Sequence, residues 1–154
     1  MNLLAIDPGP VESAWLFWEN DRPTKSRKVR NDIFVSQLSA LGAPSDGVFI
    51  EMIASYGMPV GAEVFETCVW IGRFMEAAGS ARVRRIFRKD VKMHLCGQTK
   101  AKDGNIRQAL IDRFGGKEKA IGKKKTPGPL YGISGDVWAA LAVAVTAYDQ
   151  AKPS

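Results

Sequence analysis

Short apolar runs alternate with turn-forming residues along the first third of the chain. Residues 3–7 are apolar up to a final acid and precede Pro8-Gly9-Pro10, which predicts a strand that stops at a tight turn. Residues 12–18 are apolar enough for a second strand, paired with the first as a hairpin. The polar residues 25–29 are a candidate third strand at a sheet edge. This pattern predicts three antiparallel strands.

The next segments alternate between helical and strand-like patterns. Asp32 is a candidate N-cap for a helix to about residue 41, and residues 48–51 form a β-rich run that ends on Glu51. Residues 53–61 contain two glycines and a proline and predict a loop, whereas residues 63–78 have apolar positions at helical spacing. Residues 83–87 predict a fifth strand, followed by helices over 88–95 and 103–114.

The end of the chain combines a basic segment with a very apolar one. Residues 115–132 are rich in Lys and Gly and hold few core-forming residues, which predicts a flexible basic surface loop. Ser134 is a candidate N-cap for a buried last helix over about residues 135–148. The element order predicts a single α/β domain over residues 1–154, with a mixed five-stranded sheet flanked by helices.

This topology has a consequence for two acids. The first and fourth strands are expected to be parallel neighbours, so Asp7 and Glu51 are expected to emerge at the same edge of the sheet. Asp136 lies at the start of the last helix. Each acid also has a plain structural interpretation: Asp7 as a turn former, Glu51 as a solvated rim residue, and Asp136 as a favourable charge at a helix N-terminus.

If the three acids converge, a bound hard divalent cation relieves their mutual repulsion. Mg²⁺ is such a cation, and it prefers oxygen ligands. Such ions can activate water and stabilise the leaving oxygen during phosphodiester hydrolysis. The chain has one histidine, His94, which argues against a zinc site.

Net charge adds the expectation of a nucleic-acid partner. Residues 82–125 carry 15 Lys or Arg against 4 Asp or Glu, whereas the remaining residues carry 7 against 12. A basic surface that leads a polyanion toward an acidic region fits this division, although Lys and Arg that merely solvate helix faces would fit it as well.

Composition limits the class of protein. Hydrophobic residues make up 45% of the chain and charged ones 25%, as in a folded globular protein. The two cysteines suit a reducing compartment, and neither a signal peptide nor a membrane-spanning run is expected. We therefore expect a cytoplasmic protein with no membrane partner, located in the host cytoplasm if it is phage-encoded.

Three motifs resemble those of a known family. Leu4-Ala5-Ile6-Asp7-Pro8-Gly9, Phe49-Ile50-Glu51-Met52 and the stretch from Gly135-Asp136-Val137-Trp138 to Ala144 are similar to the acidic motifs of RuvC-type Holliday-junction resolvases. The similarity is greatest to their short phage-encoded branch and extends in order over almost the whole chain. It implies an RNase H-like nuclease fold, a homodimer, dependence on Mg²⁺ or Mn²⁺, and paired nicks in four-way DNA junctions. It assigns metal binding and catalysis to Asp7, Glu51 and Asp136.

The chain departs from this family at one position. Bacterial members carry a second Asp three residues after the one that matches Asp136, and this chain has Ala139 there. Asp103 and Asp149 are the candidates for a replacement ligand, with Asp103 preferred. The sequence identifies no helicase or branch-migration partner.

The resemblance also gives roles to basic and aromatic residues. Lys100 and Lys102 resemble a basic loop near the scissile phosphate, where a lysine could stabilise developing charge. We expect DNA-backbone contacts from a larger set: Arg84, Arg85, Arg88, Lys89, Lys117, Lys119, Lys123, Lys124 and Lys125. Tyr56 is a candidate for stacking on an unpaired base, with packing on its own loop as the alternative. A surplus apolar face of the helix over residues 63–78 would suit a dimer.

Three other functions remain open on the sequence. The same acids would serve an RNase H-like nuclease that cuts flaps, RNA–DNA hybrids or other branched DNA. The fold could also serve a DNA-binding module without catalysis. An actin-like nucleotide-binding domain is disfavoured, because the chain is too short for two lobes.

Overall fold

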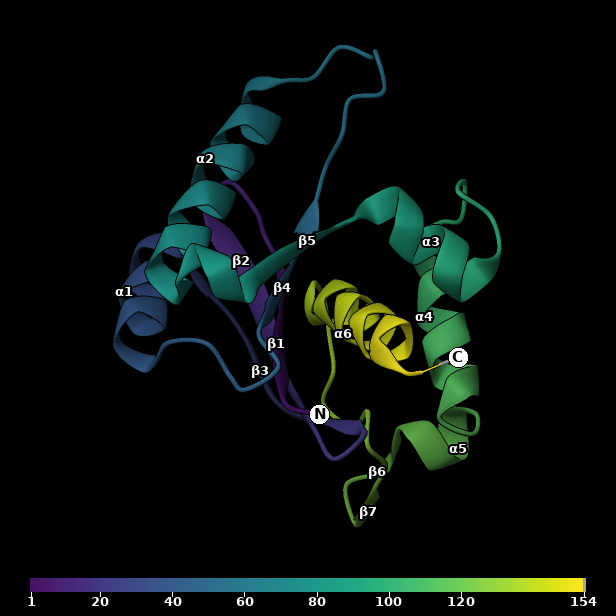
Figure 1. Ribbon diagram of the computed structural model, residues 1–154. Helices are drawn as coiled ribbons and strands as arrows, with labels where there is room; N and C mark the ends of the chain where they lie inside the picture. Colours follow the sequence, from purple (N-terminus) through teal and green to yellow (C-terminus); the bar gives the residue numbers. More distant parts are fainter. Residues whose placement is uncertain (154) are drawn as a thin grey trace.

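The sheet at the centre of the molecule has the strand order β3-β2-β1-β4-β5 (Figure 1). In this computed structural model, which describes residues 1–153, β1 (Leu3–Asp7), β2 (Glu12–Glu19) and β3 (Arg22–Arg30) pair antiparallel. On the other side of β1, β4 (Val48–Met52) and β5 (Val83–Phe87) add in parallel. The predicted mixed sheet is therefore confirmed. β3 begins three residues earlier than expected, because an edge strand accommodates Pro23.

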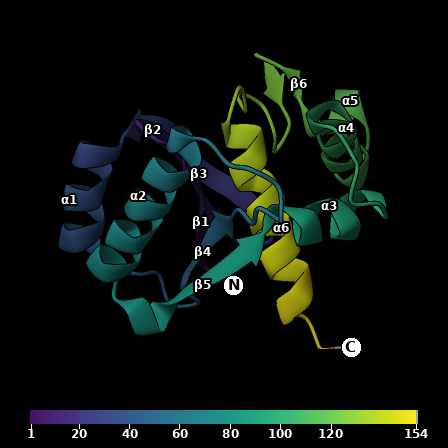
Figure 2. The same cartoon turned by 90° about the horizontal axis from the view of Figure 1, so that it is seen from above.

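Helices cover both faces of this sheet (Figure 2). One face carries α1 (Asn31–Leu41) and α2 (Ala62–Ala78), and the short 3₁₀ turn Ser80–Arg82 leads from α2 into β5. The other face carries α6 (Val137–Ala151). Beyond α6 lie α3 (Arg88–Cys96), α4 (Asp103–Arg113) and α5 (Lys117–Ala120), so the segment rich in Lys and Arg forms the outer layer on the α6 side.

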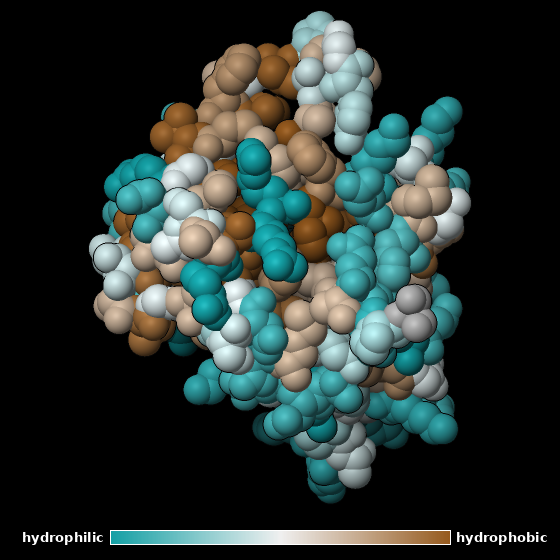
Figure 3. Space-filling model, viewed as in Figure 1, coloured by the Kyte–Doolittle hydropathy of each residue, from teal (hydrophilic) through white to brown (hydrophobic). Residues whose placement is uncertain are grey.

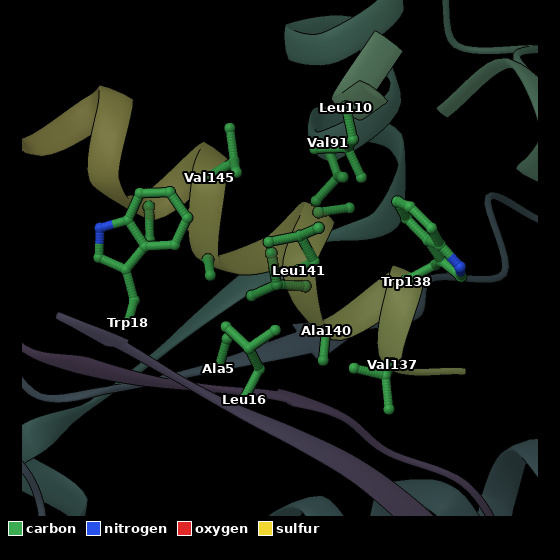
Figure 4. Close-up of a cluster of buried hydrophobic side chains, with 14 of the residues drawn as sticks. Ala5, Leu16, Trp18, Val91, Leu110, Val137, Trp138, Ala140, Leu141 and Val145 are labelled. Carbon is green, nitrogen blue, oxygen red and sulfur yellow. The ribbon is translucent and has the colours of Figure 1, made fainter. Parts of the chain in front are cut away.

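The apolar core is divided by the sheet into two clusters. Leu4 and Ile6 of β1 pack with residues of α1 and α2, whereas Leu3 and Ala5 pack with α6. Figure 4 shows Leu141 of α6 among side chains from the sheet and from α3 and α4. Leu141 is fully buried, so truncation to alanine should cost about 2–5 kcal/mol of stability.

Strand alternation decides where the two sheet acids point. Leu3 and Ala5 of β1 face α6, and Asp7 continues this alternation. On β4, Phe49 faces α6 and Glu51 follows two residues later. Ile6 pairs with Ile50 in the parallel ladder of β1 and β4, so Asp7 and Glu51 occupy the next row on adjacent strands, on the face that α6 covers.

Two helix boundaries differ from the sequence expectation. Arg30, not Asp32, is the N-cap of α1, and Asp32 lies in the first turn. Asp136, not Ser134, precedes the first residue of α6, and no side chain caps that helix. Gly135 is in a left-handed conformation with φ of 53°, which ends the loop and delays the start of the helix. Asp136 therefore lies just before the first turn of α6 and is exposed.

The segment 115–132 contains more structure than the predicted loop. It holds α5 and a small hairpin of β6 (Gly122–Lys123) and β7 (Thr126–Pro127). Ala120 and Leu130 are buried in the core, and the Leu130 amide donates to the Ala120 carbonyl at 2.8 Å. Few residues of this segment enter the core, as expected, but these two attach it to the rest of the domain. Its flexibility stays a prediction.

Candidate active site

Four carboxylates from four elements line one cleft in the α6 face of the sheet. They are Asp7 at the end of β1, Glu51 in β4, Asp103 at the start of α4 and Asp136 at the start of α6. The cleft has a volume of about 150 Å³, and its remaining lining residues include Arg88, Lys92, Arg107, Trp138 and Ala139. We call it the acidic cleft. The structure thus brings together all three acids singled out in the sequence motifs.

The turn that follows Asp7 is held by two buried polar residues, Ser13 and Asn31. The Ser13 hydroxyl accepts from the Gly9 amide at 3.2 Å and donates to Asn31 Oδ1 at 2.6 Å. Asn31 Nδ2 donates to the Gly9 carbonyl at 2.8 Å. A Cβ on Gly9 would lie 2.3 Å from the Glu12 carbonyl oxygen, so a side chain does not fit there. These contacts fix the backbone just beyond Asp7.

Glu51 is almost completely buried and has one cationic partner. Arg88 Nε and Nη2 each lie 2.8 Å from Glu51 Oε1, and the Glu51 side chain is 5% exposed. Burial raises the pKa of Glu51 above its ordinary value, and the charge and hydrogen bonds of Arg88 offset part of that effect. Arg88, expected to contact DNA, is therefore bound to a carboxylate of the cleft.

Asp136 has a cationic partner as well, supplied by the sheet edge. Lys28 Nζ on β3 lies 2.7 Å from Asp136 Oδ2. The hydrogen bond to Asp136 raises the pKa of Lys28 above its ordinary value. Lys28 was not singled out in the sequence.

Asp7 lies between these two pairs and has the most perturbed carboxyl group of the cleft. Burial, followed by the negative charges of Glu51 and Asp136, raises the pKa of Asp7 to about 8. A partly buried acid surrounded by other acids is the arrangement that a bound cation relieves. The perturbed pKa also marks this cleft as a candidate functional site.

The donor set of the cleft fits a hard divalent cation, because it consists of carboxylate oxygens. Within residues 1–153, however, no three His, Cys, Asp or Glu side chains are grouped as a ready coordination site. Lys28 binds one oxygen of Asp136, and Arg88 binds one oxygen of Glu51. Both acids are thus paired with cationic side chains of the protein itself. The role of Asp7, Glu51, Asp136 and Asp103 as metal ligands stays a prediction.

The two candidates for a replacement ligand are separated by the fold. Asp103 lines the acidic cleft together with Ala139. Asp149 follows Asp136 by 13 residues on α6, which corresponds to about 20 Å of helix. It instead binds both Nη atoms of Arg113 and lies 2.7 Å from His94 Nε2. Asp149 thus belongs to a structural ion-pair cluster at the far end of α6.

The basic residues in the cleft are not the lysines expected there. Lys92 lies four residues after Arg88 on α3, and Arg107 lies four residues after Asp103 on α4, so each shares a helix face with a cleft residue. The Arg107 guanidinium stacks 4.9 Å from the centre of the Trp138 ring. Lys100 and Lys102 are exposed outside the residues that line the cleft. In the sequence, the four-residue spacing from Arg88 to Lys92 and from Asp103 to Arg107 could have identified Lys92 and Arg107 as residues of the cleft.

The other predicted DNA contacts are distributed over the surface. Arg84 and Arg85 are exposed on β5 and, as successive strand residues, point to opposite faces of the sheet. Lys89 Nζ lies 4.9 Å from the centre of the Tyr56 ring, and Tyr56 is 61% exposed in the loop after β4. Lys123, Lys124 and Lys125 are exposed at the tip of the β6–β7 hairpin.

One view of the surface separates a hydrophobic region from a hydrophilic one. Figure 3 shows hydrophobic residues over the upper part of the region where Figure 1 places α2. Hydrophilic residues cover the region of α3 to β7 in that view. None of the helices in residues 1–153 is long and apolar enough to cross a membrane.

Comparison with known proteins supports the fold. No protein-family model and no curated protein sequence matches the chain. A Thermus thermophilus RuvC structure is similar with a TM-score of 0.65 and 19% identity, covering 97% of this chain and 96% of that one. The T. thermophilus RuvC in complex with a Holliday-junction substrate is similar with a TM-score of 0.64 and 17% identity, covering 95% and 92%. The chain therefore has the RNase H-like fold of RuvC, as predicted.

Proposed function

We propose that this protein is a structure-selective endonuclease that resolves four-way DNA junctions with paired nicks, using Mg²⁺ or Mn²⁺. The observation that carries the proposal is the acidic cleft, in which Asp7, Glu51, Asp103 and Asp136 converge within a RuvC-like fold. The likeness to a RuvC bound to a Holliday junction supports the substrate class. Kinship with the phage-encoded branch stays a prediction.

The residues of the cleft divide into two roles. Asp7, Glu51 and Asp136 would hold the cation. Asp103 would supply the fourth carboxylate, because position 139 is an alanine. When bound, a divalent cation polarises the phosphodiester and favours attack by water. Arg88 holds Glu51 in place through Oε1, and Lys92 and Arg107 present positive charge to a phosphate that enters the cleft. The stack on Trp138 restricts the motion of Arg107.

The outer basic layer would position the DNA without reading its sequence. Its helices α3 and α4 contribute residues to the cleft, and most Lys and Arg side chains of residues 82–125 are exposed. Such residues attract phosphates and release counterions, so binding should weaken steeply as salt rises. Lys89 and Tyr56 lie together beside this layer, where the ring could stack on an unpaired base.

The proposal includes a homodimer, because paired nicks need two active sites. Phe65 and Val69 lie four residues apart on α2 and are 63% and 56% exposed. In the adjoining loop, Met58 is 71% exposed. An apolar face of this kind on a helix suits a two-fold contact between identical chains.

The function is tested by cleavage of defined DNA substrates with Mg²⁺. We expect symmetric paired nicks on a four-way junction and little cutting of flaps or RNA–DNA hybrids. Asp7→Asn and Glu51→Gln should lower the rate by at least about 10³-fold while junction binding persists. Asp112→Asn is the matched control, because this exposed carboxylate of α4 lies outside the acidic cleft.

Each contrary result of this experiment favours a defined alternative. Equal cutting of flaps or hybrids would point to a broader RNase H-like nuclease. Binding without cleavage at any protein concentration would point to a DNA-binding module. A cleft variant that cuts at the rate of the unsubstituted protein would remove that residue from the active site.

A further inference from the structure

Lys28 has a position that the sheet register fixes. Asp7 on β1 pairs with Ala14 on β2, and Ala14 pairs with Lys28 on β3, so the three residues form one row across the antiparallel strands. Side chains in one row share a face of the sheet, which here is the face covered by α6. The row places Lys28 about 10 Å from Asp7, within reach of the start of α6.

The ion pair that Lys28 forms is unsuited to a purely structural role. The side chains of Lys28 and Asp136 are 48% and 55% exposed, and pairs between exposed groups contribute little to stability. The neighbouring pair is different, because Glu51 is only 5% exposed beside Arg88. Of these two pairs, the Lys28–Asp136 pair is therefore the more easily separated.

Lys28 also lies at the boundary of the acidic cleft. A second, open hollow is lined by Asp7, Glu12, Lys28, Arg88 and Asp136, together with the turn after Asp7. Asp7, Arg88 and Asp136 line both this hollow and the acidic cleft. A divalent cation that uses Asp136 would meet the Lys28 ammonium at the same carboxylate.

We propose that Lys28 is a built-in counter-ion for Asp136, which a divalent cation must displace when it binds in the acidic cleft. This inference rests on the proposed function, because it takes Asp136 as a metal ligand. Since the two cations compete, weakening one interaction must strengthen the other.

The test is the affinity for Mn²⁺ alone, measured by isothermal titration calorimetry without DNA. Lys28→Met keeps the approximate length of the side chain and removes its charge. We expect it to bind Mn²⁺ about threefold to tenfold more tightly than the unsubstituted protein, because the competing ammonium is gone. Lys28→Arg, which keeps a cation, should bind with nearly unchanged affinity.

Lys25→Met is the matched control for net charge. Lys25 is exposed on the same strand but pairs with Phe17, whose side chain packs on the α1 and α2 side of the sheet. Its removal changes the total charge equally and should leave the Mn²⁺ affinity within about twofold, because screening weakens exposed charges at a distance. Circular dichroism and urea unfolding of each variant would show that the fold is kept.

The outcomes separate this inference from the proposed function. If the unsubstituted protein binds Mn²⁺ but Lys28→Met binds it equally or more weakly, Lys28 is no competitor and only the inference fails. If Lys25→Met tightens binding as much as Lys28→Met, the effect is one of net charge and the inference fails again. If the unsubstituted protein binds no Mn²⁺, the metal-dependent function and the inference fail together.

Discussion

Arg88 directs two donors at a single oxygen of Glu51. Nε and Nη2 each lie 2.8 Å from Oε1, although the backbone positions are 37 residues apart in the chain. Because β4 and β5 are parallel neighbours, the end of β4 and the start of α3 meet at the same edge of the sheet. Arg88 thus balances the charge of a buried acid and leaves Oε2 outside this interaction.

Removal of the guanidinium should destabilise the protein. Arg88→Met leaves Glu51 buried without its cationic partner, and we expect the free energy of unfolding to fall by about 1–3 kcal/mol at pH 7. Urea denaturation measures this change. Arg84→Met on β5 is the control, because Arg84 is exposed and should cost about 0.5 kcal/mol or less. An equal loss of unfolding free energy in both variants would mean that the contact between Arg88 and Glu51 does not stabilise the protein more than an exposed arginine does.

The acid at the end of β1 should destabilise the metal-free protein. The pKa of Asp7 is raised from 3.8 to about 8, so the folded state holds a proton there that the unfolded state releases above about pH 4. The contribution of the Asp7 carboxyl to the free energy of unfolding is therefore fully present below pH 3.8 and is lost as the pH rises to about 8.

Asp7→Asn removes this titration and should therefore be more stable than the unsubstituted protein. We expect the difference to be small near pH 4 and to reach about 1–3 kcal/mol near pH 8, measured by urea unfolding in EDTA. A difference that does not grow with pH would show that Asp7 is ionised at no cost in the folded chain.

The turn after Asp7 should depend on Asn31. This side chain is 1% exposed and links Ser13 to the Gly9 carbonyl, so Asn31→Ala leaves the buried Ser13 hydroxyl and the part-buried Gly9 carbonyl without this partner. We expect a loss of about 2–3 kcal/mol in urea unfolding, with slower junction cleavage because the support of Asp7 is lost. Gln37→Ala is the control, since Gln37 is exposed on the same helix. Cleavage at an unchanged rate would show that this network is not needed to position Asp7.

Much of the sheet and the convergence of its acids could be predicted from the sequence. Apolar runs that end on Asp7 and Glu51 define two strands, and the order of the elements makes these strands parallel neighbours. Helix 137–151 could also be recognised, but its first residues could not. Gly135 adopts a positive φ that moves the start of the helix beyond Ser134 and leaves Asp136 exposed.

The partners of the acids could not be predicted, because they depend on strand register and on tertiary contacts. Lys28 lies close to Asp136 because the strand register places it in one row with Asp7 and Ala14 across β1, β2 and β3. Asn31 is a polar residue at a helix start, and nothing in the sequence places it under the turn at Gly9. Likewise, Ala120 and Leu130 fix the segment 115–132 although Lys and Gly dominate its composition.

The most direct test of the proposed active site is a crystal structure of the protein soaked in Mn²⁺, with the metal located by its anomalous scattering. We expect a peak in the acidic cleft, with oxygens of Asp7, of Glu51 and of Asp136 or Asp103 within about 2.5 Å of the ion. Lys28 Nζ should then lie farther from Asp136 than its present 2.7 Å. A well-occupied Mn²⁺ site elsewhere, with these carboxylates still bound to Lys28 and Arg88, would contradict the proposal.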